Sequence, residues 1–234
     1  MADGMDTAVA IVGMAARLPG ARNPSEYWQN LAGGVESIVP LTEQQLLDAG
    51  VSREAMNRPG YVRSAAPLEH MDWFDADFFG FSPKDAAIMD PQHRLLLETA
   101  WRAVEHSGTA PTSLADSNTG VFVGLATHDY LGMASDELTY PEIEAYMAIG
   151  TSGAAAAGRI SYRLGLQGPA VAVDTACSSS LVAIHQACQA LQLGECDLAL
   201  AGGANVLLTP ATMITFSNAH MLAPDGRCKT FDAA

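Results

Sequence analysis

The segment 170–193 constrains the fold of this chain more than any other part of the sequence. Its first residues, AVAVD, form a short apolar run, which is typical of a buried strand. After the small residues TACSSS, apolar side chains recur at helical offsets of 0, 3, 7 and 10: Leu181, Ile184, Cys188 and Leu191. The segment therefore predicts a central strand at 170–174 that passes directly into a helix over 177–193.

The same alternation extends along the chain. Apolar runs predict further strands at 8–13, 119–126 and 197–208, the last with a glycine turn or bulge inside. Helix signals lie between them: a proline after Asn23, a capping box at Thr42, a proline after Asp90, and a small-residue pattern within 141–164. Strands that alternate with helices predict an α/β fold with a largely parallel sheet.

Residues 51–82 have no clear period and are expected to be irregular. They include the cluster MDWFDADFFGF at 71–81, which we expect to be loop aromatics packed on the core. The helix after Asp90 carries apolar residues nearly all round, so it should be buried on more than one side.

The charge and cysteine content exclude several classes of protein. A net charge of −14 over 234 residues argues against a nucleic-acid surface and against binding to anionic membranes, although Arg159, Arg163, Arg227 and Lys229 could form a local basic patch. No 18-residue apolar stretch predicts a membrane span, and no secretory signal is visible. The four cysteines form no C-x-x-C pair and no zinc pattern, so we expect no metal site and a reducing cytoplasmic setting.

Cys177 falls where the predicted strand passes into the helix. The start of a helix carries a partial positive charge, which favours a thiolate, and its free backbone N–H groups can stabilise an oxyanion. The small neighbours of Cys177 allow a sharp turn and the approach of a substrate. A thiol there suits acyl transfer. The alternative is that Cys177 is a small buried apolar residue, as free cysteines often are, and this is the reading we give to Cys188 and Cys196.

No histidine is marked as the base for Cys177. His185 lies eight residues along the same helix, about 12 Å away at the rise of an α-helix, and is assigned to packing. The others have no partner signal: His93 and His106 on the helix after Asp90, and His70, His128 and His220 in loops.

The segment DTACSSSLVAIHQA at 174–187 resembles the active-site signature of β-ketoacyl synthases. The resemblance continues, in the family's order, through AIVGMAARLPGA, FFGFSPKDAAIMDPQHRLLLETAWRAVEHSG, VFVGLATHDY, LALAGGANVLL and the terminal DGRCKTFDAA. It covers about residues 8–234 and points to the ketosynthase domain of a modular type I polyketide synthase.

The resemblance implies a thiolase-like layered fold (αβαβα) made of two similar halves, usually in a homodimer. It also implies decarboxylative Claisen condensation of a Cys177-bound acyl group with a malonyl-type extender. No cofactor would bind directly, because both substrates arrive on the phosphopantetheine of an acyl carrier protein. The other implied partners are the adjacent acyltransferase and further synthase domains.

The family's two catalytic histidines and its lysine lie in motifs that do not occur here. We therefore expect a short N-terminal tail at 1–7 and the N-terminal portion of a ketosynthase domain at 8–234, truncated before the catalytic histidines. The missing base would come from the other half, so the isolated fragment should be inactive. The alternative is a non-catalytic half-domain that contributes only dimerisation or carrier-protein docking; an unrelated cysteine hydrolase has no Cys/His signature to support it.

Few residue roles carry over from the family. Cys177 matches the nucleophile, and its backbone N–H matches one oxyanion donor. A second group matches the region near the acyl tunnel and dimer interface: Tyr146, Met147, Thr151 and Ser152. The helix over 153–164 would lie near the twofold axis, or its alanines would serve plain internal packing.

Overall fold

The computed structural model describes residues 8–126, 129–136 and 149–229. The chain divides into two compact units. The sheet unit comprises residues up to Ala16 together with Met71–Val206, and the small unit comprises Arg17–His70 together with the residues from Leu207 onward.

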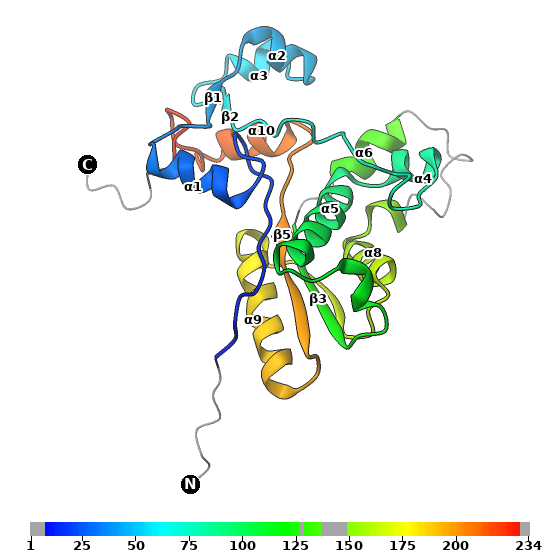
Figure 1. Cartoon of the computed structure of the whole chain (residues 1–234). Coiled ribbons are helices and arrows are strands. Elements are labelled where there is room, and N and C mark those ends of the chain that lie inside the picture. The colour runs from blue at the N-terminus through cyan, green and yellow to red at the C-terminus, as the bar shows by residue number, and fades with distance from the viewer. Residues whose placement is uncertain (1–7, 127–128, 137–148, 230–234) are drawn as a thin grey trace. The chain divides into compact units, whose positions relative to one another are not determined.

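The sheet unit is built on three parallel strands in the order β4-β3-β5 (Figure 1). These are β3 (Thr119–Leu125), β4 (Ala170–Val173) and β5 (Leu198–Ala204). Every residue of β3 is buried, and it pairs with β4 from Val121 to Gly124 and with β5 along its whole length. The predicted parallel α/β sheet is therefore confirmed.

The prediction that the strand before Cys177 is central was wrong. β4 pairs only with β3 among the described strands, so it is an edge strand of this sheet. Its two alanines, Ala170 and Ala172, are exposed, whereas Val173 is buried. Alanine is apolar but small, so a run of alanine and valine has the same pattern whether one face or both faces of the strand are covered.

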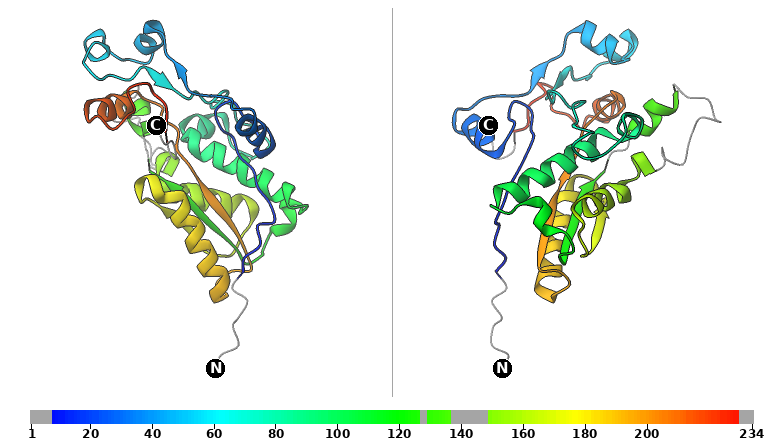
Figure 2. Two further views of the ribbon diagram at one scale, coloured as in Figure 1. Left: turned by 90° about the vertical axis from the view of Figure 1, so that its left-hand side faces the viewer. Right: turned by 45° about the vertical axis from the view of Figure 1, so that its right-hand side comes forward.

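Alternate residues of β3 face two different helix layers, as the period of a strand requires. Val121, Val123 and Leu125 belong to a core cluster with residues of α5 (Pro91–His106) and α8 (Gly153–Leu164). Phe122 instead packs with alanines of α9 (Ser179–Leu193). The sheet thus separates α5 and α8 from α9, which gives three layers (Figures 1 and 2).

Helix α9 contacts the sheet mainly through small residues, and the predicted apolar stripe was wrong for Leu181 and Ile184, whereas Leu191 packs against the core and Cys188 is half-buried. Its buried positions are Ser179, Ala183, Ala187 and Ala190. Leu181 and Ile184 are 71% and 43% exposed. At the first turn of α9, glycines of the facing strands bring the helix backbone so close that only small side chains fit there. Further along, the alanines pack on Phe122 and Val173.

Helix α5 begins as predicted. The Asp90 carboxylate accepts a hydrogen bond from the N–H of Gln92 at 2.8 Å, and Pro91 occupies the first turn. The Gln92 side chain in turn accepts from the N–H of Val206 at 3.0 Å, just beyond β5. Seven residues of α5 are buried, which agrees with the expectation of burial on several sides.

The remaining helices of the sheet unit are short: α4 (Pro83–Ile88), the 3-10 turn η1 (Pro111–Leu114) and α6 (Asp129–Asp136). The aromatic cluster packs largely as predicted, because Phe79 is buried and Phe74 and Phe81 lie against the same core. Arg159 and Arg163 of α8 both lie over the Phe81 ring, with their guanidinium carbons 5.8 and 5.4 Å from its centroid.

Two other expectations need correction. Residues 8–13 form no strand, and Ile11 is 82% exposed. Residues 197–208 contain no bulge, because Gly202 and Gly203 stay in continuous register with Val123 and Gly124. The first error arises because an apolar pattern does not reveal whether a neighbouring strand is present to complete the hydrogen-bond ladder. The second arises because a glycine in a strand also marks a close approach by another element, as at Gly203, rather than a bulge.

The small unit holds four helices and one antiparallel strand pair in its described residues. They are α1 (Pro24–Ala32), α2 (Glu43–Asp48), α3 (Arg53–Met56), α10 (Ala211–Asn218), β1 (Val39–Pro40) and β2 (Ser64–Ala65). Residues 51–82 are therefore less irregular than expected. Leu46, Val51 and Met56 are buried together in its core.

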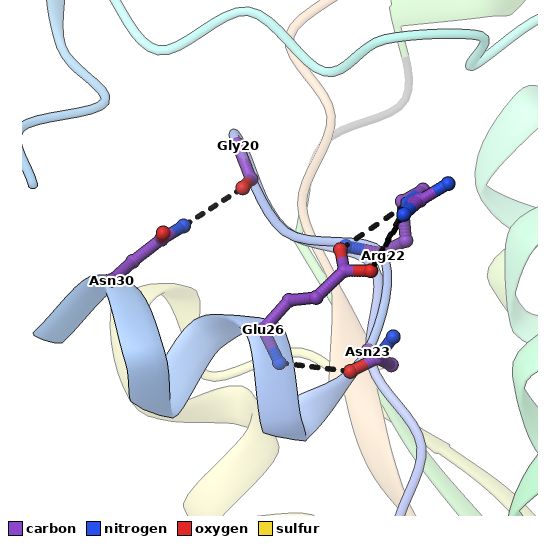
Figure 3. Close-up of polar contacts among 5 residues, drawn as sticks. All are labelled: Gly20, Arg22, Asn23, Glu26 and Asn30. Atoms are coloured by element: carbon purple, nitrogen blue, oxygen red, sulfur yellow. Dashed lines mark hydrogen bonds and ion pairs between the residues drawn. The ribbon is translucent and has the colours of Figure 1, made fainter.

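Two helix starts of the small unit were predicted correctly. The Asn23 side chain accepts from the N–H of Glu26 at 2.9 Å, and Thr42 and Gln45 form the capping box (Figure 3 shows the first). Glu26 also accepts a 2.8 Å hydrogen bond from the Arg22 guanidinium, which lowers the pKa of this carboxyl. Asn30 donates to the carbonyl of Gly20 at 2.7 Å, so the loop before α1 is fixed at two points.

No helix in the described parts of the chain is both long and apolar enough to cross a bilayer.

The contact between β3 and α9 predicts that substitution by alanine has very different effects on stability at two glycines. A Cβ atom at Gly124 would lie 2.6 Å from backbone atoms of Ser179 and Ser180, whereas one at Gly202 meets nothing within 4 Å. We expect Gly124→Ala to lower the free energy of unfolding by about 1–3 kcal/mol, the usual effect of overpacking. The matched Gly202→Ala variant should be neutral or slightly stabilising, and urea unfolding followed by circular dichroism measures both. Equal midpoints for the two variants would contradict the close contact.

Candidate active site

Cys177 lies in a sharp turn between β4 and α9. The chain leaves β4 at Val173 and passes through the 3-10 turn η3 (Ala176–Ser178), and α9 begins at Ser179. Cys177 is exposed. Its predecessor Ala176 has a φ of +55°, a left-handed conformation that alanine rarely adopts. The sequence prediction of a strand-to-helix turn at Cys177 is confirmed, and burial of this thiol in the core is not observed.

Side-chain hydrogen bonds close the turn. The Asp174 carboxylate accepts from the N–H of Ala176 at 3.0 Å. The Ser179 hydroxyl accepts from the N–H of Thr175 at 2.9 Å and donates to the carbonyl of Ala176 at 2.7 Å. The Ser178 hydroxyl donates to the carbonyl of Thr175 at 2.8 Å. Short polar side chains therefore satisfy backbone groups of the two residues that precede Cys177.

The backbone N–H of Cys177 makes no hydrogen bond to any residue that the structure describes. It stands at the N-terminal end of α9, where the helix dipole favours negative charge. An unpaired donor at this position beside an exposed thiol suits the stabilisation of charge on a carbonyl oxygen. Its assignment as an oxyanion donor remains a prediction.

Two glycines seat the first turn of α9 on the sheet. A Cβ atom at Gly203 of β5 would lie 2.9 Å from the carbonyl oxygen of Gly124 and 3.0 Å from Cβ of Ser180. The contact at Gly124 is closer still. Together the two contacts place the start of α9 against the carboxyl ends of β3 and β5. The carboxyl ends of parallel strands are the usual location of ligand sites in α/β proteins.

The other predicted site residues are not brought to Cys177 by any described hydrogen bond. Tyr146 and Met147 lie outside the described residues. Thr151 is buried, and Ser152 is exposed at the start of α8. Helix α8 buries Ala156, Ala157, Ile160 and Leu164 in the sheet-unit core, which supports internal packing for this face of the helix. A place near a twofold axis remains a prediction for its exposed face.

No described hydrogen bond joins a histidine to Cys177. His93 is buried in α5, and the Nδ1 atom of His106 accepts from the N–H of Met14 at 3.2 Å. His185 is exposed on α9, and His70 and His220 belong to the small unit. His128 lies outside the described residues. The described parts of the chain also contain no cluster of metal ligands.

Sequence reasoning missed the residues that shape the turn. Ser179 is buried beneath the start of α9, and Asp174 and Gly124 complete its surroundings. The available signal was the run of three serines after Cys177, in which only the second lies on the buried face together with Ala183 and Ala187.

Residues 6–234 match the family model for the beta-ketoacyl synthase, N-terminal domain. The pikromycin polyketide synthase component PikAII of Streptomyces venezuelae is 49% identical over 96% of this chain, and the polyketide synthase GfsE of Streptomyces halstedii is 48% identical over 98%. The chain spans only 6% of the length of each of these two relatives.

Solved structures of ketosynthases are similar to this chain as well. The ketosynthase from module 6 of the bacillaene synthase of Bacillus subtilis 168 is similar with a TM-score of 0.80 and 39% identity. A ketosynthase domain from oxazolomycin synthesis in Streptomyces albus JA3453 gives a TM-score of 0.82 and 35% identity. Each match covers 94% of this chain but only 36% and 38% of the solved chain. The three layers seen here are thus the first half of a thiolase-like layered fold.

The four thiols should differ in reactivity in the folded protein. Cys196 is buried, and this burial raises the pKa of its thiol, so it should resist limiting iodoacetamide at neutral pH. Cys177 should be labelled first, ahead of Cys228 and the half-buried Cys188. Peptide mapping by mass spectrometry measures the order, and denatured protein provides the control in which all four react. Equal labelling of the four thiols in folded protein would contradict activation of Cys177 by its position at the start of α9.

Proposed function

Because the chain belongs to the family of the beta-ketoacyl synthase N-terminal domain, we propose that it is the N-terminal portion of a ketosynthase domain in a modular type I polyketide synthase. In this proposal the 234-residue polypeptide supplies the nucleophile for elongation of the polyketide. The observation that carries it is the exposed thiol of Cys177 in a hydrogen-bonded turn at the start of a helix.

The first step is acyl transfer to Cys177. The thiolate attacks the carbonyl carbon of an acyl thioester held by the phosphopantetheine arm of a carrier protein. A new C–S bond forms, the old C–S bond breaks, and the phosphopantetheine sulfur leaves as the thiolate and takes up the proton that Cys177 released. Splitting the overall reaction at this covalent stage replaces one difficult step by two easier ones.

The second step is condensation. A malonyl-type thioester on a carrier loses CO₂, and the electron pair of the broken C–C bond remains on the α-carbon as an enolate. This carbon attacks the acyl carbonyl on Cys177, a new C–C bond forms, and the Cys177 sulfur leaves as the thiolate. Both steps pass through a negatively charged carbonyl oxygen, which the N–H of Cys177 would stabilise.

The exposed side of α9 supports the view that this chain is one part of a larger layered domain. Leu181 lies on the side of the helix opposite the alanines that cover the sheet, and Ile184 lies beside that alanine face. Large apolar side chains in such a position are typical of a face that another layer covers. That layer would belong to the second half of the domain, which in this family carries the catalytic histidines and lysine.

The partners follow from the same proposal. They are the acyl carrier protein, the adjacent acyltransferase and other synthase domains, and a second copy of the ketosynthase in a homodimer. The position of β4 supports the last of these, because β3 alone flanks it among the described strands and its other edge is open to a further strand.

Acylation of Cys177 tests the function directly. The full-length protein, incubated with an acyl thioester of its carrier protein, should gain the mass of one acyl group per site. Cys177→Ala should lose this adduct completely, because the variant lacks the sulfur that forms the bond. The matched control Cys188→Ala removes a thiol on the same helix and should keep the adduct. An adduct that persists in the Cys177→Ala variant would refute the assignment of the nucleophile.

The 234-residue chain alone is expected to form no condensed product from acyl and malonyl carriers, since it lacks the family's histidine motifs. Chromatographic detection of the β-ketoacyl product measures this, with the full-length protein as the positive control. Turnover by the chain alone would overturn the proposal that essential groups lie elsewhere.

A further inference from the structure

We propose that Ser179 is the positioning residue for the Cys177 thiol: its buried hydroxyl holds Ala176 in the left-handed conformation that directs the thiol outward. The inference rests on the proposed function for the catalytic role of the thiol. The positioning of the thiol by Ser179 depends only on the geometry of the turn.

The conformation of Ala176 requires an explanation. Its φ of +55° brings Cβ close to the following carbonyl oxygen, so isolated alanine disfavours it. Left-handed non-glycine residues persist where surrounding interactions hold them. Rotation of Ala176 to an ordinary φ would redirect the next Cα–Cβ bond, which belongs to Cys177. The direction of the thiol therefore depends on whatever holds Ala176.

Ser179 makes the two hydrogen bonds that hold it. Its hydroxyl accepts from the N–H of Thr175 at 2.9 Å and donates to the carbonyl of Ala176 at 2.7 Å. These two backbone groups lie on either side of the dihedral angles of Thr175 and Ala176. The Ser179 side chain thus fixes both ends of the two-residue segment Thr175–Ala176. Between these ends, the Asp174 carboxylate accepts a hydrogen bond from the N–H of Ala176.

The position of Ser179 is itself fixed by the sheet. The residue is only 5% exposed, and its Cβ lies 2.9 Å from the place where Gly124 would carry a side chain. Water therefore has little access to replace the hydroxyl if it is removed. Ser180 offers a natural contrast, because it is exposed and its hydroxyl makes no described hydrogen bond.

The test uses the full-length protein and three variants. Ser179→Ala should slow both alkylation of Cys177 by iodoacetamide and its loading from an acyl carrier by about tenfold, in line with the loss of a buried hydrogen-bonding group. Ser180→Ala, a matched change one residue later, should leave both rates within about twofold of the parent, since surface substitutions usually have small effects. Site-resolved mass spectrometry follows Cys177 alone.

A double variant separates positioning from general stability. Glycine adopts the left-handed region without strain, so Ala176→Gly added to Ser179→Ala should restore most of the alkylation rate. A purely structural role for Ser179 predicts a lower unfolding temperature with no recovery of rate in the double variant. That result, or equal rates for Ser179→Ala and Ser180→Ala, would overturn the inference. If the parent is alkylated at Cys177 but never acylated, the proposed function fails while the positioning role is still measured.

Discussion

The close contact between the first turn of α9 and the glycines of β3 and β5 is the constraint on which the rest of the site depends. Gly124 and Gly203 carry no side chain where the backbone of Ser179 and Cβ of Ser180 must pass. This contact fixes where the helix starts and therefore where the turn from β4 must end. Cys177 is exposed because the chain has only residues 174–178 in which to make that turn. Along the rest of the helix, the alanine face of α9 packs on Phe122 and Val173 of the sheet.

The described residues contain a candidate nucleophile and a candidate oxyanion donor, and no described hydrogen bond joins a base to either of them. The thiol of Cys177 and its backbone N–H belong to one turn, and no described hydrogen bond joins a histidine to them; His106, for example, accepts from the N–H of Met14. In the proposed ketosynthase domain of two similar halves, the catalytic groups would be divided between the halves. One half would present the Cys177 sulfur at the start of a helix, and the other would provide the groups that move protons and stabilise the enolate.

The sequence predicted those features that depend on local chemistry. The caps at Asn23, Thr42 and Asp90 and the turn at Cys177 all follow from short-range hydrogen bonds or strand and helix periods, and they were correct. The errors concern partners distant in the chain. Whether residues 8–13 join a sheet or whether β4 lies at an edge depends on which strands are adjacent, and amino-acid pattern alone does not encode adjacency. The buried face of α9 was misassigned because Leu181 and Ile184 are more apolar than its alanines.

The most direct test of the proposed site is a high-resolution crystal structure of the full-length protein with an acyl group trapped on its nucleophile. We expect a thioester at Cys177, with the acyl carbonyl oxygen about 2.7–3.1 Å from the backbone nitrogen of Cys177, the range for oxyanion donors. Ala176 should keep a positive φ, with the Ser179 hydroxyl between Thr175 and Ala176. An acyl group on another residue, or a Cys177 sulfur packed away from the start of α9, would contradict this role for Cys177.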